Sequence, residues 1–211
     1  MKRIDFYLDF LSPYAYLAFE ALPQTLVGLN YQVVHRPVLL AGLLQHHGNK
    51  GPAETPVKRD WLYRQVLWTA RQQGVSMDLP AAHPFNPLPL LRMAVACDAQ
   101  GEPNRHVCGQ LFRHVWQGGA DAVAPARLQA LQAALKPARD PAGAEVTQQR
   151  RTATEAAARA GIFGVPSFVV EGKLFWGMDA LPMLRAFLAG DDWFAGPAWQ
   201  AVRDVPIGVA R

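Results

Sequence analysis

The chain has 211 residues, half of them hydrophobic and only 18% charged, so it is long enough for one large domain and too apolar to be intrinsically disordered. Its formal net charge of +4 favours small anionic ligands. No basic run alternates with aromatic residues, so no nucleic-acid partner is expected, and no stretch is apolar enough to span a membrane.

The first part of the chain predicts a strand, a helix and a second strand. Residues 4–10 form an apolar run typical of a buried strand, and residues 14–22 have helical character, with a kink or an end near Pro23. Residues 31–38 alternate and are rich in β-branched side chains, which predicts the second strand. A crossover of this kind is right-handed and makes the two strands parallel.

The middle of the chain is predicted to be helical. Loop residues 48–52 are rich in turn-forming Gly, Asn and Pro. Apolar residues at helical spacing, with glycine stop signals, predict helices at 58–73, 90–99, 102–117, 125–135 and 144–159.

After Gly161 the pattern changes to a hairpin and a last helix. Residues 163–170 lead into a strand, Glu171 and Gly172 form a tight turn, and residues 173–176 return as the second strand. A helix is expected over 180–188 with Asp179 as its N-cap, followed by an irregular tail at 191–211 that packs over the domain.

This order of elements predicts an α/β protein with a thioredoxin-like layout. The βαβ unit and the later ββα unit, residues 1–40 and 161–211, form one thioredoxin-like domain. A helical domain, residues 41–160, is inserted between the two halves.

The junction between the first strand and the first helix holds the most informative residue, Ser12. A serine followed by Pro13 is a good helix start, because the hydroxyl caps free amides and proline tolerates the first helical position. One interpretation of Ser12 is therefore a structural cap. The other is that Ser12 presents its hydroxyl and the positive end of the helix to an anionic ligand.

Four segments in the same order as in a known family favour the second interpretation. Residues 9–14, 48–53, 164–167 and 175–179 resemble those of the 2-hydroxychromene-2-carboxylate isomerases, over nearly the whole chain. That family belongs with the kappa-class glutathione transferases and the DsbA-like thioredoxin folds. The resemblance implies a glutathione-dependent cis–trans isomerase that interconverts 2-hydroxychromene-2-carboxylate and trans-o-hydroxybenzylidenepyruvate in aromatic catabolism of the naphthalene type.

The resemblance also implies a set of site residues. Ser12 matches the serine that hydrogen-bonds the sulfur of glutathione, and Pro166 matches the cis-proline of the fold. The remaining implied glutathione-binding positions are Asn49, Lys58, Val165, Asp179 and Ala180. Ala180 stands where the family usually has a polar or basic residue, so it offers only its backbone N–H.

The residues at the junction support this chemistry independently. Positions 12 to 15 carry no cysteine, which excludes the dithiol chemistry that a helix N-terminus promotes in disulfide oxidoreductases. A serine there suits a site that stabilises the thiolate of a bound thiol. One such charge-assisted hydrogen bond contributes roughly 1.5–3 kcal/mol.

Two further functions remain open from the sequence. One is a kappa-like glutathione transferase or peroxidase, and the other is a non-catalytic glutathione-binding module. A small aromatic oxo-acid is the expected substrate, with Arg36, Lys58 or Arg92 as candidates to receive its carboxylate. The resemblance implies a homodimer.

No metal is expected, and the chain is expected to be cytoplasmic. The histidines lack the spacing of metal ligands, and residues 1–5 lead straight into a strand without a signal peptide. Cys97 and Cys108 lie in apolar helical segments and do not resemble a disulfide framework. Four aromatic residues at helical positions are expected in the core or lining a pocket: Trp61, Trp68, Phe112 and Trp116.

Overall fold

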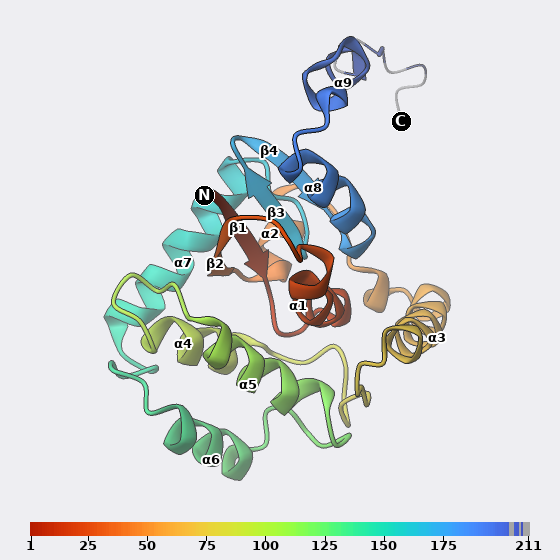
Figure 1. Cartoon of the computed structure of the whole chain (residues 1–211). Helices are drawn as coiled ribbons and strands as arrows, with labels where there is room; N and C mark the ends of the chain where they lie inside the picture. Colours follow the sequence, from red (N-terminus) through yellow and green to blue (C-terminus); the bar gives the residue numbers. More distant parts are fainter. Residues whose placement is uncertain (203–204, 207, 209–211) are drawn as a thin grey trace.

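A four-stranded mixed sheet lies at the centre of the computed structural model, which describes residues 1–202, 205–206 and 208 (Figure 1). The strand order is β2-β1-β3-β4; β1 and β2 run parallel, and β3 is antiparallel to both β1 and β4. The strands are β1 (Lys2–Leu8), β2 (Tyr31–Pro37), β3 (Ser167–Val170) and β4 (Lys173–Trp176). The α/β class and the parallel βαβ unit are therefore confirmed.

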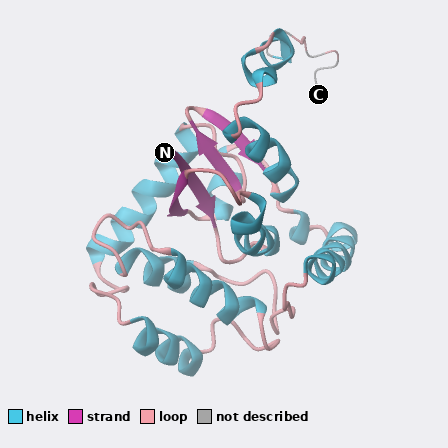
Figure 2. Ribbon diagram, viewed as in Figure 1, coloured by secondary structure: helices cyan, strands magenta, loops and turns pink. Residues whose placement is uncertain are grey.

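Helices surround the sheet (Figure 2). The longer ones are α1 (Pro13–Thr25), α3 (Pro56–Gln73), α4 (Leu88–Ala96), α5 (Arg105–Trp116), α6 (Pro125–Leu135) and α7 (Ala144–Arg159). The shorter ones are α2 (Leu40–His46), α8 (Leu181–Leu188) and α9 (Pro197–Ala201), with 3-10 turns η1 (Pro52–Glu54), η2 (Met178–Ala180) and η3 (Asp192–Ala195). The predicted bounds of α6 and α7 are confirmed.

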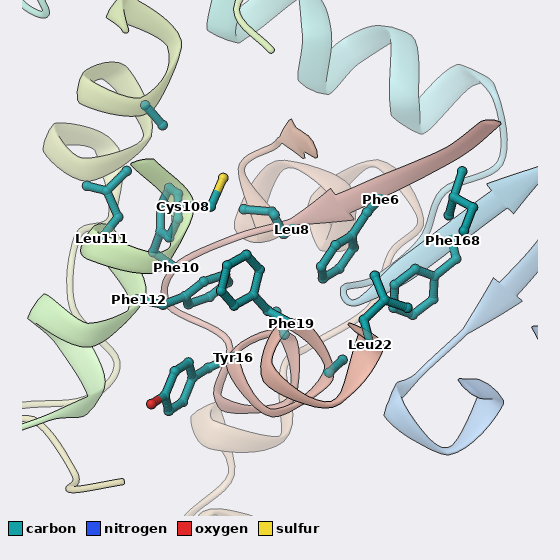
Figure 3. Packing of buried hydrophobic residues seen from close by; sticks show 14 of the residues in the cluster. Phe6, Leu8, Phe10, Tyr16, Phe19, Leu22, Cys108, Leu111, Phe112 and Phe168 are labelled. Carbon is teal, nitrogen blue, oxygen red and sulfur yellow. The ribbon is translucent and has the colours of Figure 1, made fainter. Parts of the chain in front are cut away.

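The main core joins one face of the sheet to helices from both halves of the chain. Alternate residues of β1, Ile4, Phe6 and Leu8, are fully buried on this face because successive strand side chains point to opposite sides. Figure 3 shows Phe10, from the turn after β1, in one aromatic group with Phe19 of α1 and Phe112 of α5. This core runs continuously from the sheet into α4 and α5. The division at residues 41 and 161 stays a prediction.

The opposite face of the sheet is covered by α2 and α7. Leu43 of α2, Ala157 of α7 and Val165 belong to a separate apolar cluster, against which Tyr7 and Val169 of the sheet pack. The helix α7 therefore packs on the sheet, although it comes from the middle of the chain. This packing brings the segment that follows α7 close to the end of β1.

The first helix runs through Pro23 and ends two residues later, at Thr25, close to where its end was predicted. Proline lacks the amide that would bond the carbonyl four residues earlier, Phe19. That carbonyl accepts a hydrogen bond from the guanidinium of Arg105 at 3.0 Å instead. The helix therefore continues to Thr25.

Two predictions near the C-terminus are wrong. The helix predicted over 180–188 is α8, which begins at Leu181 with Ala180 as its N-cap. Asp179 lies two residues before this helix, in η2, and makes no capping hydrogen bond. The tail is also not irregular throughout, since its described part forms η3 and α9. Phe194 and Trp199 from these turns stack near Phe175 of β4, which ties the tail to the domain; the rest of the tail lies outside the described residues.

Candidate active site

A buried carboxylate organises the turn between β1 and α1. Asp9 is fully buried, and its two oxygens accept the backbone amides of Leu11 at 3.1 Å and Leu40 at 2.8 Å. Its own carbonyl accepts the amide of Ser12 at 3.0 Å. Burial raises the pKa of Asp9 to about 6, against which these amide bonds act. The turn that precedes Ser12 is thus anchored to the start of α2.

Ser12 has both of the features that its position predicted. Its hydroxyl oxygen accepts the amide of Ala15 at 3.2 Å, which caps α1, and Pro13 occupies the first helical position. The same hydroxyl lies 3.4 Å from the carbonyl oxygen of Val165. A hydroxyl has one proton and two lone pairs, so it can cap the helix and still donate to another group. The cap and the ligand contact are therefore compatible.

The turn before β3 faces this hydroxyl. The Val165–Pro166 bond is cis, as the resemblance implies for Pro166. The Pro166 carbonyl accepts the amide of Gly177 at 2.9 Å, and the Ser167 hydroxyl donates to the Gly164 carbonyl at 2.7 Å. Within the described part of the chain, the Val165 amide donates to no other group. An extended peptide ligand could therefore pair with this amide beside Ser12.

A groove of about 440 Å³ opens beside the first turn of α1. Its lining residues are Tyr14, Pro52, Val57, Lys58, Trp61, Leu62 and Gln65. The Tyr14 hydroxyl donates to the side-chain oxygen of Gln65 at 2.8 Å. Burial, and after it the Asp179 carboxylate, raise the pKa of Tyr14, which keeps this phenol protonated at neutral pH. The groove combines apolar walls with an ammonium and two polar groups.

The structure brings some of the predicted site residues together. Val165 and Pro166 lie beside Ser12, Lys58 lines the groove with Tyr14, and the charge of Asp179 acts on Tyr14.

The structure does not show Asn49 or Ala180 in contact with the Ser12 turn. The side chain of Asn49 is exposed, and within the residues that the structure describes it makes no hydrogen bond to the Ser12 turn. The Ala180 amide already donates to the Gly177 carbonyl at 3.3 Å, so this donor is engaged within η2.

A polar layer beneath the Ser12 turn was missed at the sequence level. The His83 Nε2 atom lies 2.9 Å from the Leu11 carbonyl, and its Nδ1 atom lies 2.9 Å from the Tyr63 hydroxyl. Burial lowers the pKa of His83, so the ring is neutral at pH 7 and donates from Nε2. The Trp116 indole N–H donates to the Phe10 carbonyl at 2.9 Å. No local pattern in 83–89 beyond its prolines indicated this contact.

Three of the four aromatic predictions hold and one does not. Phe112 and Trp116 are fully buried, and Trp61 lines the groove although it is 66% exposed. Trp68 is 62% exposed and does not line this groove, so the expectation that it lies in the core or in a pocket wall is wrong.

Arg36 is engaged elsewhere. It lies 2.9 Å from Asp5 and 2.5 Å from Glu102 along β2, so its charge is neutralised away from the groove. Cys97 and Cys108 are free thiols.

Among the residues that the structure describes, we find neither a metal-binding cluster nor a membrane-spanning helix. No three His, Cys, Asp or Glu side chains among them gather so that they could hold a metal ion. No helix formed by these residues combines the length and the apolar character needed to cross a membrane.

Comparison with known proteins identifies the family of the chain. Residues 3–189 match the family described as DSBA-like thioredoxin domain, so the chain belongs to that family. It is 30% identical to glutathione S-transferase kappa 1 of Rattus norvegicus, over 93% of this chain and 94% of that protein. It is 27% identical to 2-hydroxychromene-2-carboxylate isomerase of Sphingobium xenophagum, over 89% of this chain and 98% of that protein.

A solved structure shares the fold. A 2-hydroxychromene-2-carboxylate isomerase superposes with a TM-score of 0.76 at 23% identity, over 97% of this chain and all of that one. The predicted thioredoxin-like fold and the predicted resemblance are therefore confirmed.

Proposed function

We propose that the chain is a glutathione-dependent enzyme that interconverts 2-hydroxychromene-2-carboxylate and trans-o-hydroxybenzylidenepyruvate. One observation carries the proposal: the Ser12 hydroxyl caps α1 through a lone pair while its proton is directed to the carbonyl of Val165, next to the cis Pro166. The absence of cysteine from positions 12 to 15 means that the thiol must come from a ligand. The kappa glutathione transferase relative supports glutathione as that ligand.

The residues present fit a bound glutathione. The Ser12 hydroxyl can turn from the Val165 carbonyl, 3.4 Å away, toward a sulfur, because a bond of that length is weak. The unpaired Val165 amide can pair with the backbone of the cysteinyl unit beside Pro166. When bound, glutathione supplies a thiolate that adds to the unsaturated acid and leaves after rotation about the freed bond.

Ser12 promotes this chemistry by stabilising negative charge. A charge-assisted hydrogen bond of roughly 1.5–3 kcal/mol lowers the pKa of a bound thiol by about one to two units. The N-terminus of α1 adds to this effect through the positive end of the helix dipole. Thiolate is then populated near pH 7.

The polar ends of glutathione are assigned to the surrounding residues. Lys58 in the groove would receive a carboxylate, Asp179 beside Tyr14 would receive the γ-glutamyl ammonium, and Asn49 would contribute from its loop. Ala180, which follows Asp179 in η2, would form the wall of the site next to Asp179. The apolar wall formed by Trp61 and Tyr14 suits the aromatic ring of the substrate.

The test is the absorbance of 2-hydroxychromene-2-carboxylate over time, with and without glutathione, for the native protein and Ser12→Ala. Stimulation by glutathione that collapses in Ser12→Ala is the expected result. Asn104→Ala is the matched control, because Asn104 caps α5 through the Val107 amide at 3.0 Å. Equal activity of Ser12→Ala and the native protein would contradict the role of Ser12.

A kappa-like glutathione transferase or peroxidase is the second candidate, favoured by the 30% identity to the rat kappa transferase. It predicts net consumption of glutathione with an aryl halide or a peroxide, whereas the isomerase consumes none. A non-catalytic glutathione-binding module predicts calorimetric binding without turnover of either substrate. We also propose a cytoplasmic homodimer, which sedimentation of the purified protein and fractionation of its native cells would test.

A further inference from the structure

A second hollow, of about 400 Å³, lies between α2 and α7. It shares no lining residue with the groove beside Ser12. His46 of α2 and three arginines of α7, Arg150, Arg151 and Arg159, contribute to its wall. The α7 side of the hollow therefore carries three arginines against one carboxylate, Glu155, and Figure 1 shows α7 as a long helix behind the sheet.

Arg150 is the unusual member of this group. Its side chain is only 8% exposed, and its buried Nε atom has no hydrogen-bond partner. Among the described residues Arg150 makes no ion pair, whereas Arg151 is neutralised by Glu155 at 2.7 Å. The Nε atom of the neighbouring Arg92 is also buried without a partner. Buried charges in proteins are normally paired, so this charge calls for an anion.

The nearest buried carboxylate does not fill that role. Both oxygens of Asp9 accept backbone amides, from Leu11 and Leu40. Among the described residues Asp9 forms no direct ion pair with Arg150, although the two charges attract each other. The Thr154 hydroxyl accepts the Leu39 amide at 3.0 Å and donates to the Arg150 carbonyl at 3.1 Å. The Thr154 hydroxyl therefore bonds only backbone groups in the wall of the hollow. Among the described residues it does not bind the guanidinium of Arg150.

We propose that this hollow binds a phosphate group, free or as a phosphomonoester, with Arg150 as its principal donor and Arg159 at the rim. The three arginines of the wall outnumber its one carboxylate, Glu155, so the hollow keeps a net positive charge that suits the double negative charge of phosphate. Each guanidinium presents a planar fork to oxyanion oxygens. The volume of the hollow exceeds that of phosphate alone and leaves room for a small organic part. Exposed His46 faces the same space from α2.

The experiment is calorimetric titration of the native protein with inorganic phosphate at constant ionic strength, with chloride as the control anion. Saturable binding is expected. Arg150→Gln should weaken it at least about tenfold, because a charge-assisted bond is lost. Arg71→Gln, an exposed arginine on α3, should leave the affinity unchanged. Glycerol phosphate in place of phosphate distinguishes the sources: tighter binding identifies a phosphomonoester, and equal binding identifies free phosphate.

Absence of saturable heat in the native protein would overturn the proposal, and so would an unchanged affinity in Arg150→Gln. If Arg150→Gln does not fold, the exposed Arg159→Gln decides, with a several-fold loss of affinity expected and no loss contradicting the site. Ser12→Ala should bind phosphate as the native protein does. This result separates the phosphate site from the proposed glutathione site, so that either can fail alone.

Discussion

The hydroxyl oxygen of Ser12 lies 3.4 Å from the carbonyl oxygen of Val165, although 153 positions separate the two residues. One belongs to the turn after the first strand and the other to the turn before the third. The sheet places them together because β1 and β3 are neighbours and antiparallel, so the end of one meets the start of the other. The hydroxyl of Ser12 and the backbone of Val165 therefore lie next to each other at the N-terminus of α1.

Two substitutions of Ser12 should distinguish its contribution to stability from its contribution to catalysis. Ser12→Ala loses the cap of α1 and should lower the free energy of unfolding by about 1 kcal/mol, whereas Ser12→Gly should cost only a few tenths. Both variants lack the hydroxyl, so both should lose glutathione-dependent isomerisation. Urea denaturation together with the absorbance assay measures the two effects. Activity that followed stability, with Ser12→Gly close to the native protein, would assign Ser12 a purely structural role.

His83 should act as a positioning residue for the Ser12 turn. His83→Ala removes the donor to the Leu11 carbonyl and leaves that acceptor unpaired, at a cost of about 1–3 kcal/mol. We expect the affinity for glutathione, measured by calorimetry, to fall with it. His114→Ala is the matched control, since the His114 Nε2 atom lies 2.9 Å from the Ala122 carbonyl away from the groove. Equal effects of both variants on glutathione affinity would contradict a specific role for His83.

Stability should depend on pH through two buried groups that act in opposite directions. Asp9 has its pKa raised from 3.8 to about 6 by burial, so the native state holds this proton more tightly and stability falls between pH 4 and 6. Burial, and after it Arg105, lower the pKa of His35 from 6.5 to about 4, so stability rises between pH 4 and 6.5. Each contribution is about 3 kcal/mol and the two largely cancel.

Substituting Asp9 or His35 alone should reveal the pH dependence that the other group contributes. In Asp9→Asn the free energy of unfolding should rise with pH between 4 and 6.5, and in His35→Gln it should fall between pH 4 and 6. Urea denaturation at intervals of pH measures both curves relative to the native protein. Parallel curves for all three proteins would show that neither group titrates as described.

Trp116 should contribute to stability through its indole N–H as well as its ring. Trp116→Phe keeps an aromatic ring in the core but leaves the buried Phe10 carbonyl without its donor, 2.9 Å away in the native protein. The expected loss is about 1–3 kcal/mol in the free energy of unfolding from the unpaired carbonyl, with a further loss from the smaller ring. Denaturation by urea tests it, and a stability equal to that of the native protein would show that the bond contributes nothing.

Local patterns were enough to predict the elements that position the site. The Ser12–Pro13 pair marked the start of α1, and alternation along residues 31–38 marked β2. The turn at Glu171 and Gly172 has positive φ at both residues, 49° and 75°, as a tight hairpin between β3 and β4 needs. These features depend on neighbours within a few positions, so the amino-acid order alone indicates them.

The remaining features depend on partners that are distant in the chain. Arg105 binds the Phe19 carbonyl that Pro23 leaves without its helical donor, and the His83 ring supports the Ser12 turn because the folded chain brings it there. The sequence by itself determined the strand and helix order, the cap at Ser12 and the lack of a site cysteine. Only the tertiary structure decided which polar groups meet, because hydrogen bonds and charges act over a few ångströms whatever their separation along the chain.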